Sequence, residues 1–371
     1  MIQVSRVYKY LEKLEKDKQL LVDTLNSKNI TSSSNETFST LVPKIEGLVD
    51  INGYYDTTTK NTSGNITQYI KQIPMIDTSK YTSMNYMFNS YKSLITIPQL
   101  NTSNVTSMYQ MFSSCSSLTT IPQLDTSKVT DMTMMFNGCS KLTSIPHLNT
   151  SKVTDMNSMF RDCASLTTIP QLDMSKVTSM NTMFYGCSKL ISIPELDTSN
   201  VTNMNWLFYG CSSLTTVPQL NTSKVTNIGF IFYFCSSLTT IPQLDTSNAN
   251  RMDQTFRGCK SLTTIPQLDT SKVTNVSLTF ESCSSLTNLG GLTNLGQAYS
   301  TTASASYSNY TLDLYSCTLL THESLMNVIN NLYNIASIGV QPQQLVLGST
   351  NLAKLTDEEI AIATNKGWTV S

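Results

Sequence analysis

Residues 115–138 of the 371-residue chain read CSSLTTIPQLDTSKVTDMTMMFNG, and Cys139 starts the same pattern again. The spacing of 24 residues recurs about nine times and is kept by three kinds of residue: prolines from Pro74 to Pro266, phenylalanines from Phe88 to Phe280 and cysteines from Cys115 to Cys283. A mixture of unrelated elements does not keep one period in this way. The sequence therefore predicts an architecture of stacked repeats.

Each repeat carries eight apolar positions, which a single repeat cannot bury by itself. In the unit above they are Leu118, Ile121, Leu124, Val129, Met132, Met135, Phe136 and Cys139. Burying such a side chain is worth roughly 1.5–3 kcal/mol, and only when a neighbouring repeat covers it. The pattern predicts coils that stack rung over rung, with the phenylalanine column along a single axis.

Two local structures are expected inside the unit. Apolar residues three positions apart are typical of a leucine-rich turn and predict a short strand over residues 117–121, which Pro122 ends. On the return side, Met132, Met135 and Phe136 stand at i, i+3 and i+4, and this spacing predicts a helical or 3₁₀ turn.

The repeat is similar to the BspA-like class of bacterial leucine-rich repeats, close to the variant found in surface lipoproteins of wall-less bacteria. The motif that carries the resemblance is MFxGCSSLTTIPQLDTSKVTDM, and it covers residues 70–289. The resemblance implies an α/β repeat solenoid, leucine-rich-repeat-like with 24-residue turns, that serves adhesion and recognition. It implies no catalytic centre.

The N-terminal region is expected to seek a partner. We assign residues 1–50 to a helical docking or oligomerisation segment and residues 51–69 to a cap or linker. Apolar residues that alternate spacings of three and four form a heptad seam: Val4, Val7, Leu11, Leu14, Leu21 and Leu25. A short coiled coil and a single amphipathic helix packed on a neighbouring surface both fit this seam.

The C-terminal region, residues 290–371, is expected to close the solenoid with two longer strand-helix units. The stretch STTASASYSNY at residues 300–310 is typical of a loop. Thr321 is predicted to cap one helix, Thr356 and Glu359 to cap the next, and Trp368 to begin a final strand.

Both ends of the chain resemble phage and prophage tail, baseplate or fibre proteins of Gram-positive bacteria. The segments that carry this resemblance are SKNITSSSNETFSTLVPKI, from residue 27, and LGSTNLAKLTDEEIAIATNKGWTVS, residues 347–371. The resemblance implies a structural component of a virion.

Composition excludes several classes of function. The chain has 24 basic and 25 acidic side chains and a net charge of -1, so no electrostatic footprint for nucleic acid is present. No window approaches 18 uninterrupted apolar residues, so membrane insertion is not expected. The N-terminus shows no secretory signal, which predicts synthesis in the cytoplasm of the host cell.

Residues suited to catalysis or metal binding are few. His147 and His322 are the only histidines. Eight cysteines in register lack the paired C-x-x-C spacing of zinc sites, and we interpret them as buried, reduced spacers. We therefore expect no enzymatic activity, no metal and no cofactor.

Aromatic residues concentrate at positions that other repeats fill with polar residues or glycine. Together with two flanking arginines they form a candidate binding patch: Arg161, Tyr185, Trp206, Tyr209, Phe230, Tyr233, Phe234 and Arg257. Exposed aromatic clusters beside arginine are typical of binding hot spots, for sugar rings by stacking or for proteins by burial. Contact with another part of the same assembly is the alternative.

Two functional hypotheses follow. The first is a non-catalytic virion protein of a phage or phage-tail-like particle, expected to be a homo-oligomer. Its N-terminal helices would bind other tail proteins, and its repeats would bind a host surface glycan or protein. The alternative is a BspA-like bacterial surface adhesin that binds host or matrix proteins.

Overall fold

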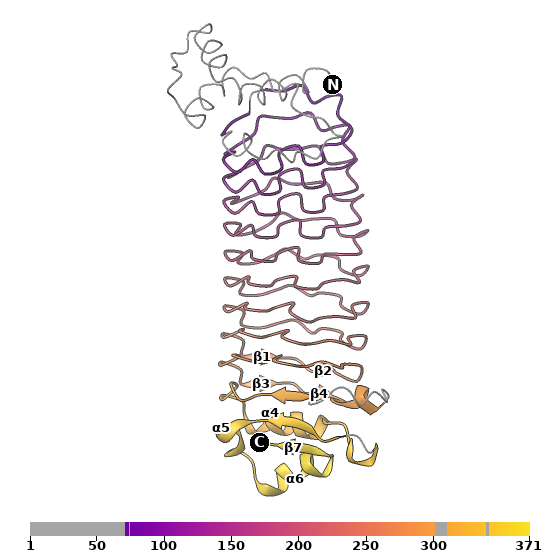
Figure 1. Cartoon of the computed structure of the whole chain (residues 1–371), viewed down its shortest axis with the longest axis vertical. Coiled ribbons are helices and arrows are strands. Elements are labelled where there is room, and N and C mark those ends of the chain that lie inside the picture. The colour runs from indigo at the N-terminus through magenta and orange to yellow at the C-terminus, as the bar shows by residue number, and fades with distance from the viewer. Residues whose placement is uncertain (1–70, 74, 301–309, 339–340) are drawn as a thin grey trace, which may run out of the picture.

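A computed structural model of the chain describes residues 71–73, 75–300, 310–338 and 341–371 (Figure 1). The predicted N-terminal regions, 1–50 and 51–69, lie outside the described residues, and so does most of the loop predicted at 300–310. The described chain winds into coils that stack along one axis, and a group of helices and strands covers the C-terminal end of the stack.

The phenylalanine column forms the spine of the core. The ring of Phe136 stacks on Phe112 with 5.6 Å between ring centroids and on Phe160 with 5.7 Å, and the planes differ by 5° and 4°. The same stacking continues to Phe280, and the rings from Phe112 onward are fully buried. The prediction of a repeat solenoid with one continuous hydrophobic spine is therefore confirmed.

Hydrogen bonds between neighbouring coils hold the backbone on two sides. On one side the N–H of Gln110 donates to the carbonyl of Thr133 at 3.0 Å, and the pattern repeats from coil to coil. On another side Thr119 N–H donates to Ile95 O at 3.1 Å. Because buried peptide groups need partners, each coil depends on the coils next to it.

The prediction of a helical or 3₁₀ turn on the return side is wrong for the backbone and right for burial. Met132, Met135 and Phe136 are all fully buried, but Met134 between them has a φ of 56°, in the left-handed region. Its N–H donates to Asn157 O at 2.9 Å. Alternate N–H groups donate to the next coil, and those between them close local turns, as Met135 N–H does to Met132 O at 3.1 Å, so successive turns replace a helix.

Strands are shorter than expected. In the described residues the strand predicted in every unit is assigned only near the C-terminal end, where β1 (Thr264–Ile265) pairs in parallel with β3 (Asn288–Leu289). There β2 (Leu268–Asp269) also pairs with β4 (Leu292–Thr293). The coil stacking thus continues past residue 289.

The C-terminal cap combines helices with one small sheet. Its elements are η3 (Gln297–Ser300), β5 (Thr311–Asp313), α4 (His322–Asn331), η4 (Ala336–Ile338), β6 (Gln343–Val346), α5 (Gly348–Leu352), α6 (Asp357–Asn365) and β7 (Trp368–Val370). Strands β5, β6 and β7 form a parallel sheet in that order. Within the described residues, none of the helices has the length and apolarity needed to span a bilayer.

The local signals for this cap are confirmed. Thr321 caps α4 by accepting from Ser324 N–H, and Thr356 and Glu359 form a capping box at α6. Trp368 is buried in β7, and its indole N–H donates to Tyr333 O at 3.1 Å.

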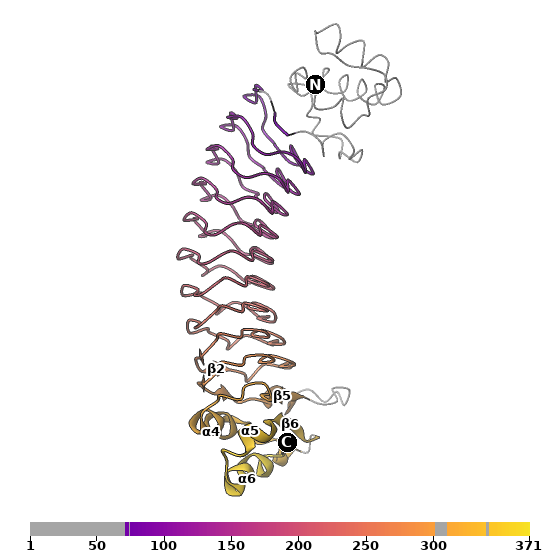
Figure 2. The same cartoon turned by 90° about the vertical axis from the view of Figure 1, so that its left-hand side faces the viewer.

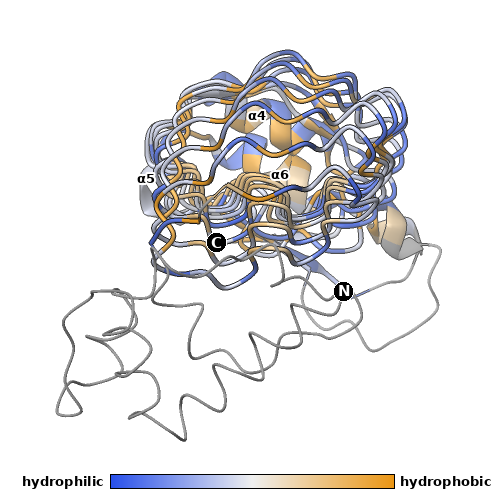
Figure 3. Cartoon of the chain, turned by 90° about the horizontal axis from the view of Figure 1, so that it is seen from above, coloured by the Kyte–Doolittle hydropathy of each residue, from blue (hydrophilic) through white to orange (hydrophobic). Residues whose placement is uncertain are grey.

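The stack is nearly uniform in cross-section but not straight. Seen along its axis, the coils nearly superpose (Figure 3), whereas the side view shows the stack bending toward the side on which β5 lies (Figure 2).

Candidate binding surface

Five side chains from one column of the coils form a stack that we call the aromatic ladder: Arg161, Tyr185, Tyr209, Tyr233 and Arg257. The ring of Tyr209 lies between those of Tyr185 and Tyr233, with centroid distances of 4.4 and 4.5 Å and planes within 2° and 8°. Arg161 Cζ lies 4.4 Å from the centroid of the Tyr185 ring, and Arg257 Cζ lies 5.7 Å from that of Tyr233. Each end of the ladder is thus covered by a cation.

A second aromatic group lies beside the ladder. Trp206 and Phe230 stack on each other at 4.4 Å, and Trp206 lies 5.4 Å from Tyr209. Phe234 meets Tyr233 edge-on at 4.4 Å, and it is 44% exposed, against 37% for Trp206. The structure therefore brings all eight predicted residues onto one surface, while their role in binding remains a prediction.

Trp206 and Phe230 occupy a backbone position that disfavours side chains. Their φ angles are 60° and 62°, and the same column has a positive φ in the other coils as well: Tyr86, Gln110, Met134, Ser158, Thr182, Gln254 and Leu278. A left-handed conformation costs a residue with a Cβ about 1–2 kcal/mol. Since the coil imposes this conformation on every member of the column, backbone preference does not explain why two of them are aromatic.

The coils lie closer together along the ladder than in the core. Successive tyrosine rings are 4.4–4.5 Å apart, whereas the Phe184, Phe208 and Phe232 rings of the same coils are 5.6–5.7 Å apart. Because each coil nearly repeats the previous one, these distances measure the local rise of the stack. The ladder therefore lies on the inside of the bend seen in Figure 2. Concave solenoid faces are common binding surfaces.

Stacking uses up the faces of the ladder rings. Tyr209 has a tyrosine on each face, and the outer faces of Tyr185 and Tyr233 are covered by arginines. Ring edges and phenol hydroxyls remain for a partner. The surroundings, with burial the larger cause and the neighbouring tyrosines the next, raise the pKa of Tyr209 to about 12, so the hydroxyl keeps its proton. Face-on stacking of a sugar between these rings is therefore blocked.

Both ends of the ladder carry ion pairs. Arg161 Nε lies 3.3 Å from Asp162 Oδ2, and Arg257 Nε lies 2.7 Å from Glu281 Oε2. Arg257 also donates to Gln254 Oε1 at 2.9 Å. These contacts fix the guanidinium groups over the terminal rings, so the ladder is preorganised.

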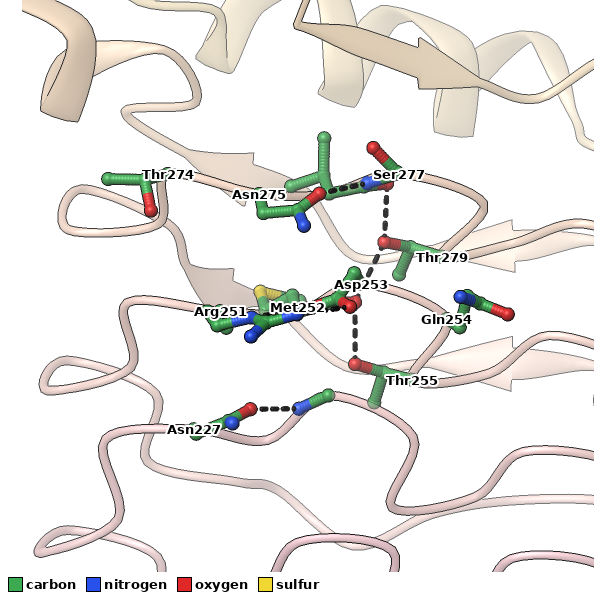
Figure 4. A network of polar contacts seen from close by, with 12 residues as sticks. Asn227, Arg251, Met252, Asp253, Gln254, Thr255, Thr274, Asn275, Ser277 and Thr279 are labelled. Carbon is green, nitrogen blue, oxygen red and sulfur yellow. Dashed lines mark hydrogen bonds and ion pairs between the residues drawn. The ribbon is translucent and has the colours of Figure 1, made fainter. Parts of the chain in front are cut away.

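A polar network supports the neighbouring coils (Figure 4). Arg251 donates from Nε and an Nη to the two carboxylate oxygens of Asp253, at 2.9 and 2.8 Å, and Asp253 is buried. In the preceding coil Asn227 accepts from Gly229 N–H at 2.9 Å. A Cβ on Gly229 would lie 3.0 Å from Asp253 Oδ1, so glycine makes room for this carboxylate.

Sequence reasoning missed Arg251 and Asp253, although a signal was present. Arg251 stands in a column that other coils fill with Ser, Asp or Asn, and Gly229 is the glycine in a column that is otherwise Asn, Tyr, Thr, Asp and Ser. Gly229 falls in the coil that carries Phe230 and Phe234, and Arg251 falls in the next coil, which carries Arg257. The irregular residues of the repeat thus gather around one surface.

The cysteines are buried spacers, as predicted. All nine are free, and Cys139 Sγ donates to Phe112 O at 3.1 Å, a contact that recurs along the column. Burial raises the pKa of the Cys139 thiol well above its usual range. Cys317, outside the 24-residue spacing, continues the column in space, because its Sγ reaches Phe280 O at 3.5 Å.

Neither histidine belongs to a catalytic constellation in the described residues. His147 is exposed, and its carbonyl accepts from Gln123 Nε2 at 2.6 Å. His322 Nε2 lies 2.8 Å from Glu359 Oε1, where it joins α4 to α6 in the cap. Across the described ranges no group of three His, Cys, Asp or Glu side chains is placed to hold a metal ion.

Threonine hydroxyls on the strand side have a structural use. Thr119 Oγ1 donates to Ile95 O at 3.2 Å, and Thr239 Oγ1 to Thr215 O at 3.2 Å. The backbone N–H of each of these threonines donates to the same carbonyl as its hydroxyl does. This hydroxyl column therefore adds a second hydrogen bond between neighbouring coils.

Several solved structures are similar to the chain. A leucine-rich repeat protein from T. pallidum is 20% identical, with a TM-score of 0.37 and coverage of 45% of this chain and 76% of that one. One from Bacteroides ovatus is 18% identical, with a TM-score of 0.27 and coverage of 62% and 74%. A leucine rich cell surface protein from Faecalibacterium prausnitzii is 18% identical, with a TM-score of 0.29 and coverage of 64% and 87%. No curated protein gives a significant match.

One family matches the repeats directly. It is described as "Mycoplasma protein of unknown function, DUF285", and its matches cover residues 57–167, 117–217, 160–261 and 213–309. These ranges overlap into one stretch that spans more than half of the chain and contains every coil of the ladder. The chain, a solenoid of the leucine-rich-repeat type, belongs to the DUF285 family.

Proposed function

We propose that this protein is a non-catalytic adhesin that binds a protein partner through the concave face of its solenoid. The aromatic ladder carries this proposal. Tyrosine, tryptophan and arginine are the residues most enriched in the energetic centres of protein interfaces. Here they share one surface on the inside of the bend, held by stacking and ion pairs.

The geometry favours a protein over a glycan at this surface. A sugar ring binds aromatic residues by lying on a ring face, and the faces of the three ladder tyrosines are already covered. Ring edges, hydroxyls and a half-exposed Trp206 suit a protein surface, which offers carbonyls to the hydroxyls and apolar groups to the rings.

The proposal of a non-catalytic role rests on the groups that could act as nucleophile or base. The thiols are buried and their pKa is raised, and His322 is paired with Glu359 far from the ladder in sequence. Neither group is poised beside the other. A nucleophile and a base within hydrogen-bond reach are the minimum for acyl transfer.

Adhesion by purified protein tests this function. Beads coated with the full chain are added to immobilised matrix proteins, namely collagen, fibronectin and laminin, and the attached beads are counted under flow. The matched variant carries Trp206→Ser and Tyr209→Asn, residues that the same two columns hold at Ser158 and Asn137. We expect attachment of the unaltered chain to at least one protein and at least a tenfold loss in the variant.

A second variant separates the ladder from the rest of the surface. Thr216→Ala and Thr240→Ala alter exposed hydroxyls on the strand side of the coils and should leave attachment unchanged. Equal attachment by the unaltered chain and both variants would exclude the ladder as an adhesive surface for these matrix proteins. So would a failure of the unaltered chain to attach.

The virion hypothesis rests on the resemblance of the two termini alone. The N-terminal segment lies outside the described residues. The C-terminal segment is part of the cap that covers the end of the stack, and this structural role is sufficient to explain its fold. Neither the matched family nor the solved structures named above is a phage protein. We therefore propose the adhesive role without placing the protein on a particle.

A further inference from the structure

We propose a second binding site, for a neutral linear oligosaccharide, in a polar groove that runs along the stack. The groove repeats the segment Gln-Leu-Asx-Thr of successive coils. One section is an open depression of about 670 Å³, lined by residues of four coils, among them Gln219, Asn221, Gln243 and Asp245. Another section, of about 530 Å³, lies between Gln99 and Asn149. Both volumes are in the range of small-molecule sites.

The groove is separate from the aromatic ladder. Asp269 lies in β2 and Thr293 in β4, and both residues line the groove, so these two strands show on which side of the stack the groove runs. In the side view β2 lies on the side of the stack opposite β5, which lies toward the inside of the bend (Figure 2). The two sites can therefore be tested independently.

One wall of the groove offers a row of acceptors. Gln219 Nε2 donates to Leu220 O at 3.1 Å and to the next coil at Gln243 O at 2.7 Å. Gln243 repeats the arrangement with Leu244 O and Gln267 O. Because the amide nitrogens are used within the wall, each Oε1 stays available to accept a hydrogen bond from a ligand.

The Asx residues two positions after each glutamine add both acceptors and donors to the lining. Asp245 Oδ1 accepts from the N–H and hydroxyl of Ser247 at 3.0 and 2.7 Å, which leaves Oδ2 free. Asn221 Oδ1 accepts the corresponding bonds from Ser223, which leaves Nδ2 as a donor. Sugar hydroxyls both donate and accept, so they can satisfy both kinds of group at each coil.

The charges of the groove narrow the class of ligand. Leu220 and Leu244 are only 1% and 2% exposed, so the polar side chains on either side of them provide the contact surface. The carboxylates of Asp245 and Asp269 would repel an acidic polysaccharide, and nearby Lys272 offsets their attraction for a cation. A neutral glycan that repeats along its length fits a groove that repeats along the stack.

The other section contains an unpartnered hydroxyl. Thr102 lines the groove, is 2% exposed and has no hydrogen-bond partner for its Oγ1. In the next coil the equivalent Thr126 Oγ1 donates to Asn149 O at 2.9 Å, and other members of the column make the same bond. A buried hydroxyl without a partner costs free energy, so Thr102 is the member of this column whose surroundings are unsatisfied.

Calorimetric titration with defined hexasaccharides tests the site. The probes are cellohexaose, chitohexaose and xylohexaose, with a hyaluronan hexasaccharide as the acidic comparison. We expect saturable binding of at least one neutral probe and at least tenfold weaker binding of the acidic one. A variant with Gln99, Gln123, Gln219 and Gln243 all changed to Ala removes the glutamine acceptors of both sections and should weaken neutral binding at least tenfold, while Thr216→Ala with Thr240→Ala should not.

Two results would overturn the proposal. One is the absence of saturable binding of all three neutral probes to the full chain. The other is binding that survives the change of all four glutamines to Ala but is lost in the Trp206→Ser/Tyr209→Asn variant, because the sugar then occupies the ladder. Far-ultraviolet spectra and melting temperatures of the variants confirm folding. A failure of the bead attachment assay would contradict the proposed role of the ladder, but it would not contradict the proposal of a sugar site in the groove.

Discussion

The ring of Phe234 occupies the space that a side chain at Gly258 would need. Phe234 stands on one coil and Gly258 in the same column on the next, and a Cβ built on Gly258 would collide with the Cδ1 and Cε1 atoms of the ring. Gly258 also has a φ of 77°. An exposed aromatic side chain of the candidate surface thus dictates a glycine in the following coil.

Gly258→Ala should destabilise the fold more than Gly210→Ala does. Both glycines have a positive φ, which costs alanine about 1–2 kcal/mol, but a Cβ on Gly210 meets nothing closer than 3.9 Å. At Gly258 the ring must also move. Urea unfolding measures the loss of unfolding free energy in each variant. Equal losses would show that the Phe234 ring moves aside without cost. Phe234→Gly in the Gly258→Ala background should then recover most of the difference.

Core and surface rings of the same coil should respond differently to truncation. Phe208→Ala leaves a cavity in the fully buried spine and should cost about 3–5 kcal/mol. Tyr209→Asn loses two stacking contacts at the surface, each worth about 0.5–1.5 kcal/mol. Denaturant unfolding of the two variants shows which substitution lowers the free energy of unfolding more. A larger loss from Tyr209→Asn would mean that the ladder, and not the spine, holds these coils together.

Acid should destabilise the solenoid through its aspartate turns. The hydroxyl, and then the N–H, of the serine two residues later hold the pKa of Asp125, Asp173, Asp197 and Asp245 below the usual 3.8. A carboxyl whose folded pKa is lowered contributes stability that is complete above its unfolded pKa and is lost as pH falls through the folded value. Melting temperature should therefore fall below about pH 4. Replacing all four by Asn, which Asn101 and Asn149 already show to fit, should flatten this dependence.

The period of the sequence was sufficient to predict the solenoid, its buried residues and the surface on which the aromatic residues meet. It did not predict the left-handed residue at Met134, because apolar spacing records which side chains are buried and not where peptide groups find partners. The column of tyrosines predicted that these rings lie on successive coils, but not how closely they approach. Their distances depend on the rise between coils, which side-chain identity does not encode, and they favour a protein over a sugar, two partners that the sequence left open.

The nine thiols should be inert in the folded protein and react together on unfolding. Each is buried, and burial raises the pKa of Cys317 to about 12 and that of Cys139 and Cys163 well above their usual range. The thiolate is the reactive species, so both access and ionisation are suppressed at neutral pH. Ellman's reagent should release almost no chromophore from the native chain and nine equivalents in denaturant. Fast reaction of one or two thiols without denaturant would reveal coils that open locally. Repeating the assay with Phe208→Ala then locates the opening. Cys235 Sγ donates to Phe208 O at 3.1 Å. The cavity should therefore speed the reaction of Cys235 and of Cys211 more than that of distant Cys115.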